Sequence, residues 1–363
     1  MNNYKILFFI FIGFCLSFYI QTNTSESAYA SDVQQKDTEN TKSNHHPNFI
    51  EASKKAVKSV VHIKSKYLSN EIYGYYDPFY GRRFFNKPQE NHASGSGVII
   101  SEDGYIITNR HVINNAEEIE VVLNDKRTYN AKILGEDSDS DLALLKIEEQ
   151  GLPFMDFDNS NNIQVGEWVL AVGNPYNLKS TVTAGIVSAK ARKINILNNG
   201  GIESFIQTDA AINSGNSGGA LVNTSGNLIG INTAIQSKTG SFSGYGFAIP
   251  SNMAQKVITD LKKYGKVRRA YIGIHITDIN MQIQKELNLK GLKGVLISKV
   301  LKNSAAEQAG LQDLDVILKI NKNEINSTSE LQEIISQFNP GENINCTILR
   351  EGETKDFVLS LQS

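Results

Sequence analysis

The stretch TDAAINSGNSGGALVNTSGNLIGINTAI, residues 208–235, decides the fold and holds the most informative serine of the chain. Ser217 stands among glycines in the pattern G-x-S-x-G, which runs from Gly215 to Gly219. Glycine adopts tight turns and lets the backbone approach another molecule closely. A serine that only fills a turn does not need these glycines. The pattern therefore predicts a hydroxyl and backbone N–H groups that face the same spot.

The residues after Ser217 read as strand, turn and strand, and the surrounding chain has the same character. From Val98 to Pro250, short apolar runs such as YIITNRHV, DLALLKI, EWVLAVG and GFAIP alternate with turn residues. A spacing of about 8–12 residues between such runs predicts β-barrels or a β-sandwich. In α/β-hydrolases, which share G-x-S-x-G, a helix follows the serine and the histidine comes later in the chain. Here the only histidine after Ser217 is His275, which lies in a separate module. The sequence therefore disfavours the α/β-hydrolase fold.

A serine hydroxyl needs a neighbouring base before it can attack a substrate. Of the six histidines, His111 lies near the end of the strand-like run YIITNRHV, where it can be held firmly and stay accessible. Asp141 directly precedes the apolar run LALL, so it can be anchored and partly buried. We interpret Asp137 and Asp139 as solvated turn residues. The chain order His111, Asp141, Ser217 is the order of the chymotrypsin triad.

Four runs together resemble the HtrA/Deg family of serine proteases: ITNRHV, DSDLALLKI, TDAAINSGNSGGALVN and GFAIP. The resemblance covers about residues 50–361, and the combination is far more specific than any single motif. It implies a mainly β protein, with a chymotrypsin-like double β-barrel protease domain followed by one α+β PDZ domain. It also implies that His111 is the general base, that Asp141 orients this base, and that Ser217 is the nucleophile.

The same resemblance implies how a substrate would be held. The backbone N–H groups of Gly215 and Ser217 would form the oxyanion hole, with Asn216 as a further candidate. Ala211 and Ile212 would help to form the substrate pocket and favour small or medium aliphatic side chains. Asn216 also carries no charge that could pair with a newly made N-terminus, so we expect no activation by zymogen cleavage.

The pattern changes after Pro250. Residues 251–266 predict a linker helix, and residues 267–363 predict the α+β PDZ module. The run YIGI matches the PDZ loop that receives a peptide C-terminal carboxylate, and the peptide would add as a strand. Its residues are Tyr271, Ile272, Gly273 and Ile274. Arg268 and Arg269 either steer that carboxylate or are simply solvated. Leu314 replaces a glycine that the family commonly has, and it would be strained if the turn needs a positive φ.

The N-terminal region predicts export. Residues 1–30 combine an apolar run with the small-x-small site Ala28-Tyr29-Ala30, which predicts a signal peptide cleaved after Ala30. A membrane anchor remains the alternative. Residues 31–48 predict a flexible tether, residues 49–250 the trypsin-like protease domain, and residues 70–97 a long aromatic loop. Cys346 would be the one cysteine left after cleavage, and we interpret it as a core residue.

We therefore expect an exported, periplasmic or extracytoplasmic, ATP-independent serine endopeptidase that degrades unfolded or damaged proteins and recognises peptide C-termini through its PDZ domain. Two alternatives stay open: a membrane-anchored protease that cuts one signalling substrate, and a chaperone or holdase with secondary proteolysis. No metal or organic cofactor is implied. The net charge of −2 gives no reason to expect nucleic acid as a partner. The resemblance implies a homotrimer or a larger homo-oligomer, and membrane contact only if the N-terminal segment is uncleaved.

Overall fold

The computed structural model describes residues 48–77, 81–175, 180–197, 201–235 and 244–363, without the side chains of residues 69–88 and 234–235. All of these residues belong to one compact unit, Pro47–Ser363. The predicted signal peptide or anchor and most of the predicted tether lie outside the described residues, so they stay predictions, as do the domain boundaries. No helix in the described part of the chain is long and apolar enough to cross a membrane.

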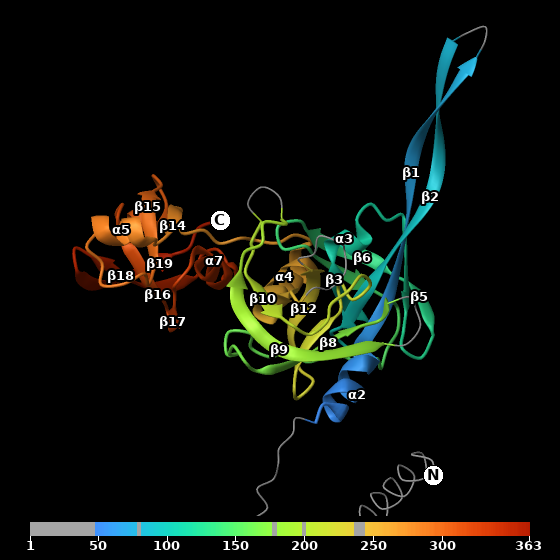
Figure 1. Ribbon diagram of the computed structural model, residues 1–363, viewed down its shortest axis with the longest axis horizontal. Coiled ribbons are helices and arrows are strands. Elements are labelled where there is room, and N and C mark those ends of the chain that lie inside the picture. The colour runs from blue at the N-terminus through green and yellow to red at the C-terminus, as the bar shows by residue number, and fades with distance from the viewer. Residues whose placement is uncertain (1–47, 78–80, 176–179, 198–200, 236–243) are drawn as a thin grey trace, which may run out of the picture. The chain divides into compact units, whose positions relative to one another are not determined.

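The first half of the protease region is an antiparallel sheet of seven strands in the order β5-β4-β1-β2-β3-β7-β6 (Figure 1). Two helices accompany it: α2 precedes β1, and the short α3 follows β3. The elements are α2 (Ile50–Ser59), β1 (Val60–Asp77), β2 (Gly81–Ile99), β3 (Tyr105–Asn109), α3 (Arg110–Ile113), β4 (Glu118–Val122), β5 (Thr128–Asn130), β6 (Lys132–Asp137) and β7 (Leu142–Lys146).

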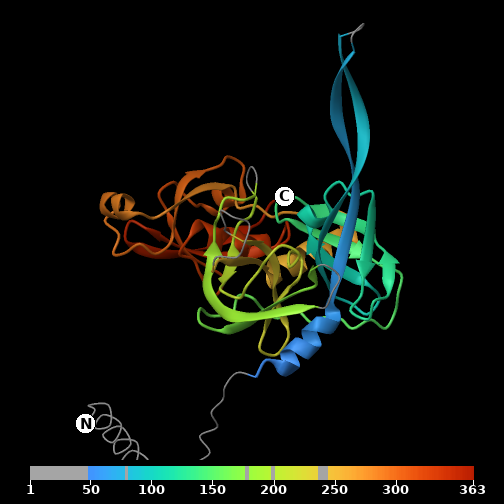
Figure 2. The same cartoon turned by 45° about the vertical axis from the view of Figure 1, so that its right-hand side comes forward.

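The prediction of a long aromatic loop at residues 70–97 is wrong, because β1 and β2 continue through it as one hairpin. The two strands pair without a register shift from Val60 opposite Val98 to Asp77 opposite Gly81. Aromatic residues favour strands, which explains how a segment without a clean hydrophobic period still forms a ladder. Figures 1 and 2 both show the hairpin extending beyond the other strands of its sheet.

The second half is a closed barrel in the order β10-β13-β12-β11-β8-β9. The stretch quoted at the outset supplies two of its strands, which pair with Ala220 opposite Ile231, as the strand–turn–strand pattern predicts. The elements are β8 (Trp168–Gly173), β9 (Thr181–Arg192), β10 (Phe205–Thr208), β11 (Ala220–Asn223), β12 (Leu228–Ile235) and β13 (Gly246–Pro250).

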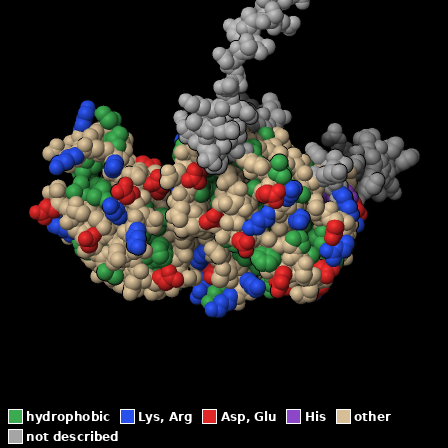
Figure 3. Space-filling model, turned by 90° about the horizontal axis from the view of Figure 1, so that it is seen from below, with side chains coloured by type: hydrophobic (Ala, Val, Ile, Leu, Met, Phe, Trp, Pro, Cys, Tyr) green, Lys and Arg blue, Asp and Glu red, His purple; other side chains and the backbone are tan. Residues whose placement is uncertain are grey.

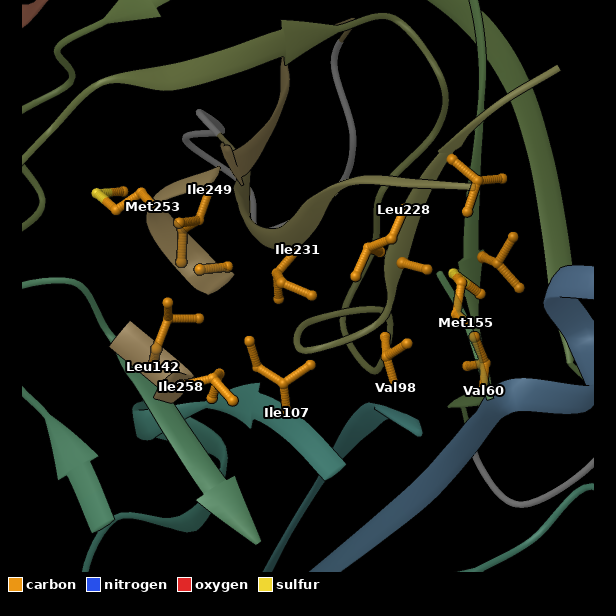
Figure 4. Packing of buried hydrophobic residues seen from close by; sticks show 14 of the residues in the cluster. Val60, Val98, Ile107, Leu142, Met155, Leu228, Ile231, Ile249, Met253 and Ile258 are labelled. Atoms are coloured by element: carbon orange, nitrogen blue, oxygen red, sulfur yellow. The ribbon is translucent and has the colours of Figure 1, made fainter. Parts of the chain in front are cut away.

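One apolar core joins the sheet, the barrel and helix α4 (Ser251–Tyr264), as Figure 4 shows. It takes residues from β1, β2, β3 and β7 on one side and from β12, β13 and α4 on the other. The labelled members include Val60, Val98, Ile107, Leu142, Leu228, Ile231, Ile249, Met253 and Ile258. Burying each such side chain contributes about 1.5–3 kcal/mol, so this core fixes the two protease sheets against each other.

The C-terminal module has its own core around Cys346, which is fully buried as predicted, and a sheet in the order β14-β15-β16-β18-β19, with β17 paired to β16. Ser327 caps the N-terminus of the main helix α7, where its hydroxyl accepts the N–H of Glu330 at 3.2 Å. The elements are β14 (Ile274–Asp278), α5 (Met281–Glu286), β15 (Val295–Val300), α6 (Ala305–Ala309), β16 (Val316–Ile320), β17 (Asn323–Glu324), α7 (Thr328–Ser336), β18 (Asn343–Arg350) and β19 (Glu353–Ser360).

The turn before β16 holds Leu314 at φ 71°, in the left-handed region that favours glycine. Its N–H donates to the carbonyl of Ile297 at 2.9 Å, and its side chain is mostly exposed. The positive φ expected at this position is therefore present, and the leucine bears a local strain of about 1–2 kcal/mol.

Candidate active site

Strand pairing brings the candidate base and acid together. Strand β3 lies beside β7 with Asn109 opposite Leu142, so the residue after the end of one strand meets the residue before the start of the other. Asp141 occupies this junction at φ 57°. Its backbone carbonyl accepts the N–H of Arg110 at 2.9 Å and the side-chain amide of Asn109 at 3.1 Å. These bonds hold His111 and Asp141 in one geometry.

The Asp141 carboxylate has three donors around it. Its Oδ2 lies 2.6 Å from Nδ1 of His111 and accepts the hydroxyl of Thr233 at 3.0 Å. Its Oδ1 accepts the backbone N–H of His111 at 3.0 Å. A carboxylate in this position favours the imidazole tautomer with its proton on Nδ1, which leaves Nε2 as a proton acceptor. The His111 side chain is half exposed, so Nε2 is accessible.

Ser217 is linked to the His111–Asp141 pair by two hydrogen bonds that both involve Thr233. The Ser217 hydroxyl donates to the backbone carbonyl of Thr233 at 3.3 Å, while the hydroxyl of the same threonine holds Asp141. Among the described residues, Ser217 makes no hydrogen bond to His111. Catalytic hydrogen bonds are often long before a substrate binds, so this geometry is compatible with a triad. The sequence reasoning missed Thr233, although it lies in the quoted stretch.

The loop around Ser217 depends on glycine on both sides of the serine. Gly215 has φ 94°, and a Cβ there would come 2.7 Å from Pro175. Gly218 has φ 82°, and a Cβ there would come 2.1 Å from the carbonyl oxygen of Ser96. No other residue fits either position without a shift of the backbone.

This loop leaves two of the three candidate oxyanion donors unpaired. The N–H of Asn216 donates to the carbonyl of Asn213 at 3.0 Å, so it is engaged within the loop. The N–H groups of Gly215 and Ser217 have no acceptor in the part of the chain that the structure describes. The arrangement therefore offers Gly215 and Ser217 as oxyanion donors and does not offer Asn216.

The two candidate pocket residues differ in their surroundings. Ile212 is buried in the barrel core, whereas Ala211 is half buried. The carbonyl of Ala211 accepts the hydroxyl of Thr183 at 2.8 Å. Of the two, Ala211 is therefore the one that a substrate could contact, whereas Ile212 belongs to the barrel core.

The candidate peptide loop lies in a groove of about 400 Å³. Tyr271, Ile272, Gly273 and Ile274 line one wall, and Leu331 and Ile335 of α7 line the other. Asp139 and Ile202 of the protease region also border the groove, and the N–H of Ile202 donates to the carbonyl of Asp139 at 2.9 Å. The structure thus brings all four predicted loop residues to one groove, next to the turn that precedes Asp141.

The interpretation of Asp137 as a solvated turn residue is wrong. Its side chain is buried, and both carboxylate oxygens accept from Nη2 of Arg269, at 2.8 and 2.7 Å. Burial has the largest single effect and lowers the pKa of Arg269, but the hydrogen bonds to Asp137 together with the charges of Asp137 and Asp139 outweigh burial and raise the pKa. Arg268 instead stacks on Tyr264 at 3.9 Å. Asp137 is buried because a distant arginine, 132 residues along the chain, neutralises it.

A second contact joins the PDZ module to the protease region. The hydroxyl of Ser204 donates to the carboxyl group of Glu333 on α7 at 2.5 Å. Burial raises the pKa of Glu333 to about 7, helped by the charge of Glu330 and opposed by the Ser204 hydrogen bond and the charge of Lys190. Beside it, the amide of Asn161 donates to the side-chain oxygen of Gln337 at 3.1 Å.

Comparisons with known proteins agree with this architecture. The family model of the trypsin-like peptidase domain matches residues 95–231, and that of the PDZ domain matches residues 270–361. A probable periplasmic serine endoprotease, DegP-like, of Chlamydia trachomatis is 45% identical over 289 residues, which cover 79% of this chain and 58% of that protein. A DegP-like relative from Marinomonas sp. is 41% identical over 338 residues, which cover 87% of this chain and 71% of that protein. The chain thus spans about three fifths of the length of several curated relatives that it matches.

Solved structures give the same result. The HtrA-type protease AlgW with a tripeptide superposes with a TM-score of 0.65 at 36% identity, covering 87% of this chain and 97% of that one. The serine endoprotease from Yersinia pestis superposes with a TM-score of 0.51 at 37% identity. Fold and site define a trypsin-like serine protease domain joined to a PDZ domain. The chain belongs to the HtrA/DegP-like family of serine endoproteases.

Proposed function

We propose that this chain is an ATP-independent serine endopeptidase that degrades unfolded or damaged exported proteins. The observation that carries the proposal is the Asp141 carboxylate, which holds Nδ1 of His111 at 2.6 Å and is linked through Thr233 to Ser217. These three residues supply an orienting acid, a base and a nucleophile in one place.

The reaction follows from these groups. His111 takes the Ser217 proton on Nε2 as the serine oxygen attacks the scissile carbonyl, and the imidazolium that forms is stabilised by Asp141. The N–H groups of Gly215 and Ser217 receive the negative charge that develops on the carbonyl oxygen. His111 then gives the proton to the leaving amine. Water attacks the acyl-enzyme with His111 again as base, which restores the serine.

The groove beside α7 and the face seen in Figure 3 suit an extended peptide better than a strongly charged ligand. On the face seen in Figure 3, lysine and arginine side chains are interspersed with acidic ones, so that face presents no field of a single sign. The groove beside α7 is lined largely by apolar side chains and offers backbone groups to an extended peptide. A C-terminal segment with an apolar last residue is the ligand that this chemistry favours.

A peptide-responsive, regulatory protease is the second candidate function. Arg269 borders the peptide groove and is bound to Asp137, four residues before Asp141. A peptide carboxylate in the groove would compete for Arg269 and disturb the turn that leads to Asp141. The competition would let groove occupancy change the activity of the triad.

We also expect a homotrimer, because the family resemblance implies one. Size-exclusion chromatography with light scattering would test this oligomeric state.

The experiment is degradation of a reduced, unfolded protein by the purified chain and by its Ser217→Ala variant, with and without a peptide that ends in an apolar residue. We expect cleavage by the native chain alone, with the variant at background. Acceleration by the peptide would support the regulatory candidate. No cleavage under any condition, with both forms still suppressing aggregation, would contradict the protease and favour a holdase.

A further inference from the structure

The buried hydroxyl of Ser96 joins three separate segments of the chain. Ser96 lies in β2 and is fully buried. Its Oγ is 2.8 Å from the backbone nitrogen of Asn174, which follows β8, and 2.6 Å from the carbonyl oxygen of Gly215. A backbone N–H can only donate and a carbonyl can only accept, so the direction of both bonds is fixed. The Ser96 hydroxyl accepts from Asn174 and donates to Gly215.

The backbone of Ser96 holds the other side of the same loop. Its N–H donates to the carbonyl of Ser217 at 2.8 Å, and its carbonyl accepts the hydroxyl of Thr108 at 2.7 Å. Gly218 packs so closely against this carbonyl that an added Cβ would lie 2.1 Å from it. One residue of the first sheet therefore contacts the loop before, at and after the candidate nucleophile.

The partner of Ser96 is itself held in place. The carbonyl of Asn174 lies 2.7 Å from Nδ1 of the buried His62, which must carry its proton there to donate. Burial lowers the pKa of His62, which favours the neutral ring. The bonds from His62 through the Asn174 backbone and the Ser96 hydroxyl to Gly215 thus form one continuous buried chain, although the buried side-chain oxygen of Asn174 has no donor among the described residues. Hydrogen bonds in such a low-dielectric interior are stronger than in water, so this chain restrains Gly215.

Gly215 needs such a restraint because its own side chain supplies none. Glycine at φ 94° can leave that conformation more easily than a residue with a Cβ, and its N–H is one of the two candidate oxyanion donors. The Gly215 carbonyl shares a peptide plane with the N–H of Asn216, so holding it limits rotation about the Gly215 backbone and thereby how the Gly215 N–H can turn. Holding the Ser217 carbonyl as well restrains the Asn216–Ser217 peptide, whose N–H is the second candidate donor.

We propose that Ser96 is a positioning residue, whose hydroxyl holds the Gly215 carbonyl and so aims the N–H groups of Gly215 and Ser217 at the developing oxyanion. The inference rests on the proposed protease function and adds a residue that touches neither substrate nor reacting atoms. Its prediction is specific. Oxyanion donors act in the transition state, so loosening them lowers kcat and leaves KM nearly unchanged.

The test compares Ser96→Ala with Ser251→Ala in the full chain, using a peptide amide substrate. Ser251 is a matched control, because its buried hydroxyl also donates to a backbone carbonyl at 2.6 Å, that of Asp158, outside the candidate site. We expect kcat of Ser96→Ala to fall about 10- to 100-fold, less than the full loss of an oxyanion donor, with KM within twofold. The inhibition constant of a peptide trifluoromethyl ketone, which forms an oxyanion on the enzyme, should rise by a similar factor.

Three results would overturn the proposal: an unchanged kcat and inhibition constant in Ser96→Ala, an equal loss of kcat in Ser251→Ala, or a loss confined to KM. If Ser96→Ala does not fold, Ser96→Cys replaces it, since a thiol is a weak donor. We expect a reduced kcat there too, and a native kcat would overturn the proposal. The native chain and Ser217→Ala, run beside these variants, separate failure of this inference from failure of the protease assignment.

Discussion

Replacing Asp141 by asparagine tests the triad with almost no change of shape. In the native chain Oδ1 accepts the His111 N–H, and Oδ2 faces Nδ1 of the same ring at 2.6 Å. An asparagine that keeps its oxygen on the N–H must turn its amide nitrogen toward Nδ1. The amide then donates to Nδ1, and the ring proton moves to Nε2. In that tautomer His111 cannot accept the Ser217 proton.

The opposite orientation of the asparagine amide costs more free energy. It would place two donors, the asparagine NH2 and the His111 N–H, against each other at a position that is mostly buried. The first orientation therefore dominates, and we expect kcat of Asp141→Asn to fall about 10⁴-fold. That loss corresponds to about 5 kcal/mol of transition-state stabilisation. KM should stay within about threefold, because the carboxylate does not contact the substrate.

The assay is steady-state cleavage of a peptide amide, with Asp139→Asn as the control. Asp139 lies in the same turn and is 45% exposed; its carboxylate makes a 3.4 Å ion pair with Arg269 and accepts the hydroxyl of Ser138 at 3.3 Å. Its variant should keep kcat within about threefold, since exposed ion pairs are worth little. An Asp141→Asn variant that folds and retains more than a tenth of the native kcat would refute the reasoning about the tautomer.

Two further predictions concern stability. Glu333 keeps its proton up to about pH 7 in the folded chain but only to about 4.5 when unfolded, so ionising it in the fold opposes folding. The free energy of unfolding should therefore fall by up to about 3 kcal/mol as the pH rises from 4.5 through 7. Urea unfolding of Glu333→Gln should show a free energy that depends less on pH in this range. The same pH dependence in the native chain and the variant would contradict this role of Glu333. Leu314→Gly should raise stability by about 0.5–1 kcal/mol, because it removes the strain at φ 71°. The control is Leu292→Gly, because Leu292 is also exposed but has no positive φ; this variant should lower the stability. A lower urea midpoint for Leu314→Gly than for the native chain would contradict the strain at Leu314.

Local patterns in the sequence were enough to predict the catalytic candidates. The order of His111, Asp141 and Ser217 follows from which residues adjoin apolar runs, and the glycines around Ser217 follow from the tight loop that they permit. The strand pairing then brings His111 and Asp141 together because both lie at the same end of neighbouring strands.

Contacts between distant segments could not be predicted in the same way. Asp137 reads as a solvated turn residue until Arg269 reaches it from the other module. Ser96 falls in the segment predicted as a loop and Thr233 in an ordinary strand pattern, and their roles depend on which acceptors the fold places beside their hydroxyls. The β1–β2 hairpin was missed because its strands lack a clean alternation, the signal on which strand prediction depends.

If His111 and Asp141 activate Ser217 as proposed, Ser217 is the one activated serine of this chain. Mass spectrometry after treatment with a fluorophosphonate, which phosphonylates activated serines with loss of fluoride, tests it most directly. We expect one adduct per chain, on Ser217, with none in Ser217→Ala and a strongly slowed reaction in Asp141→Asn. An adduct on a different serine, or labelling that survives Ser217→Ala, would contradict it.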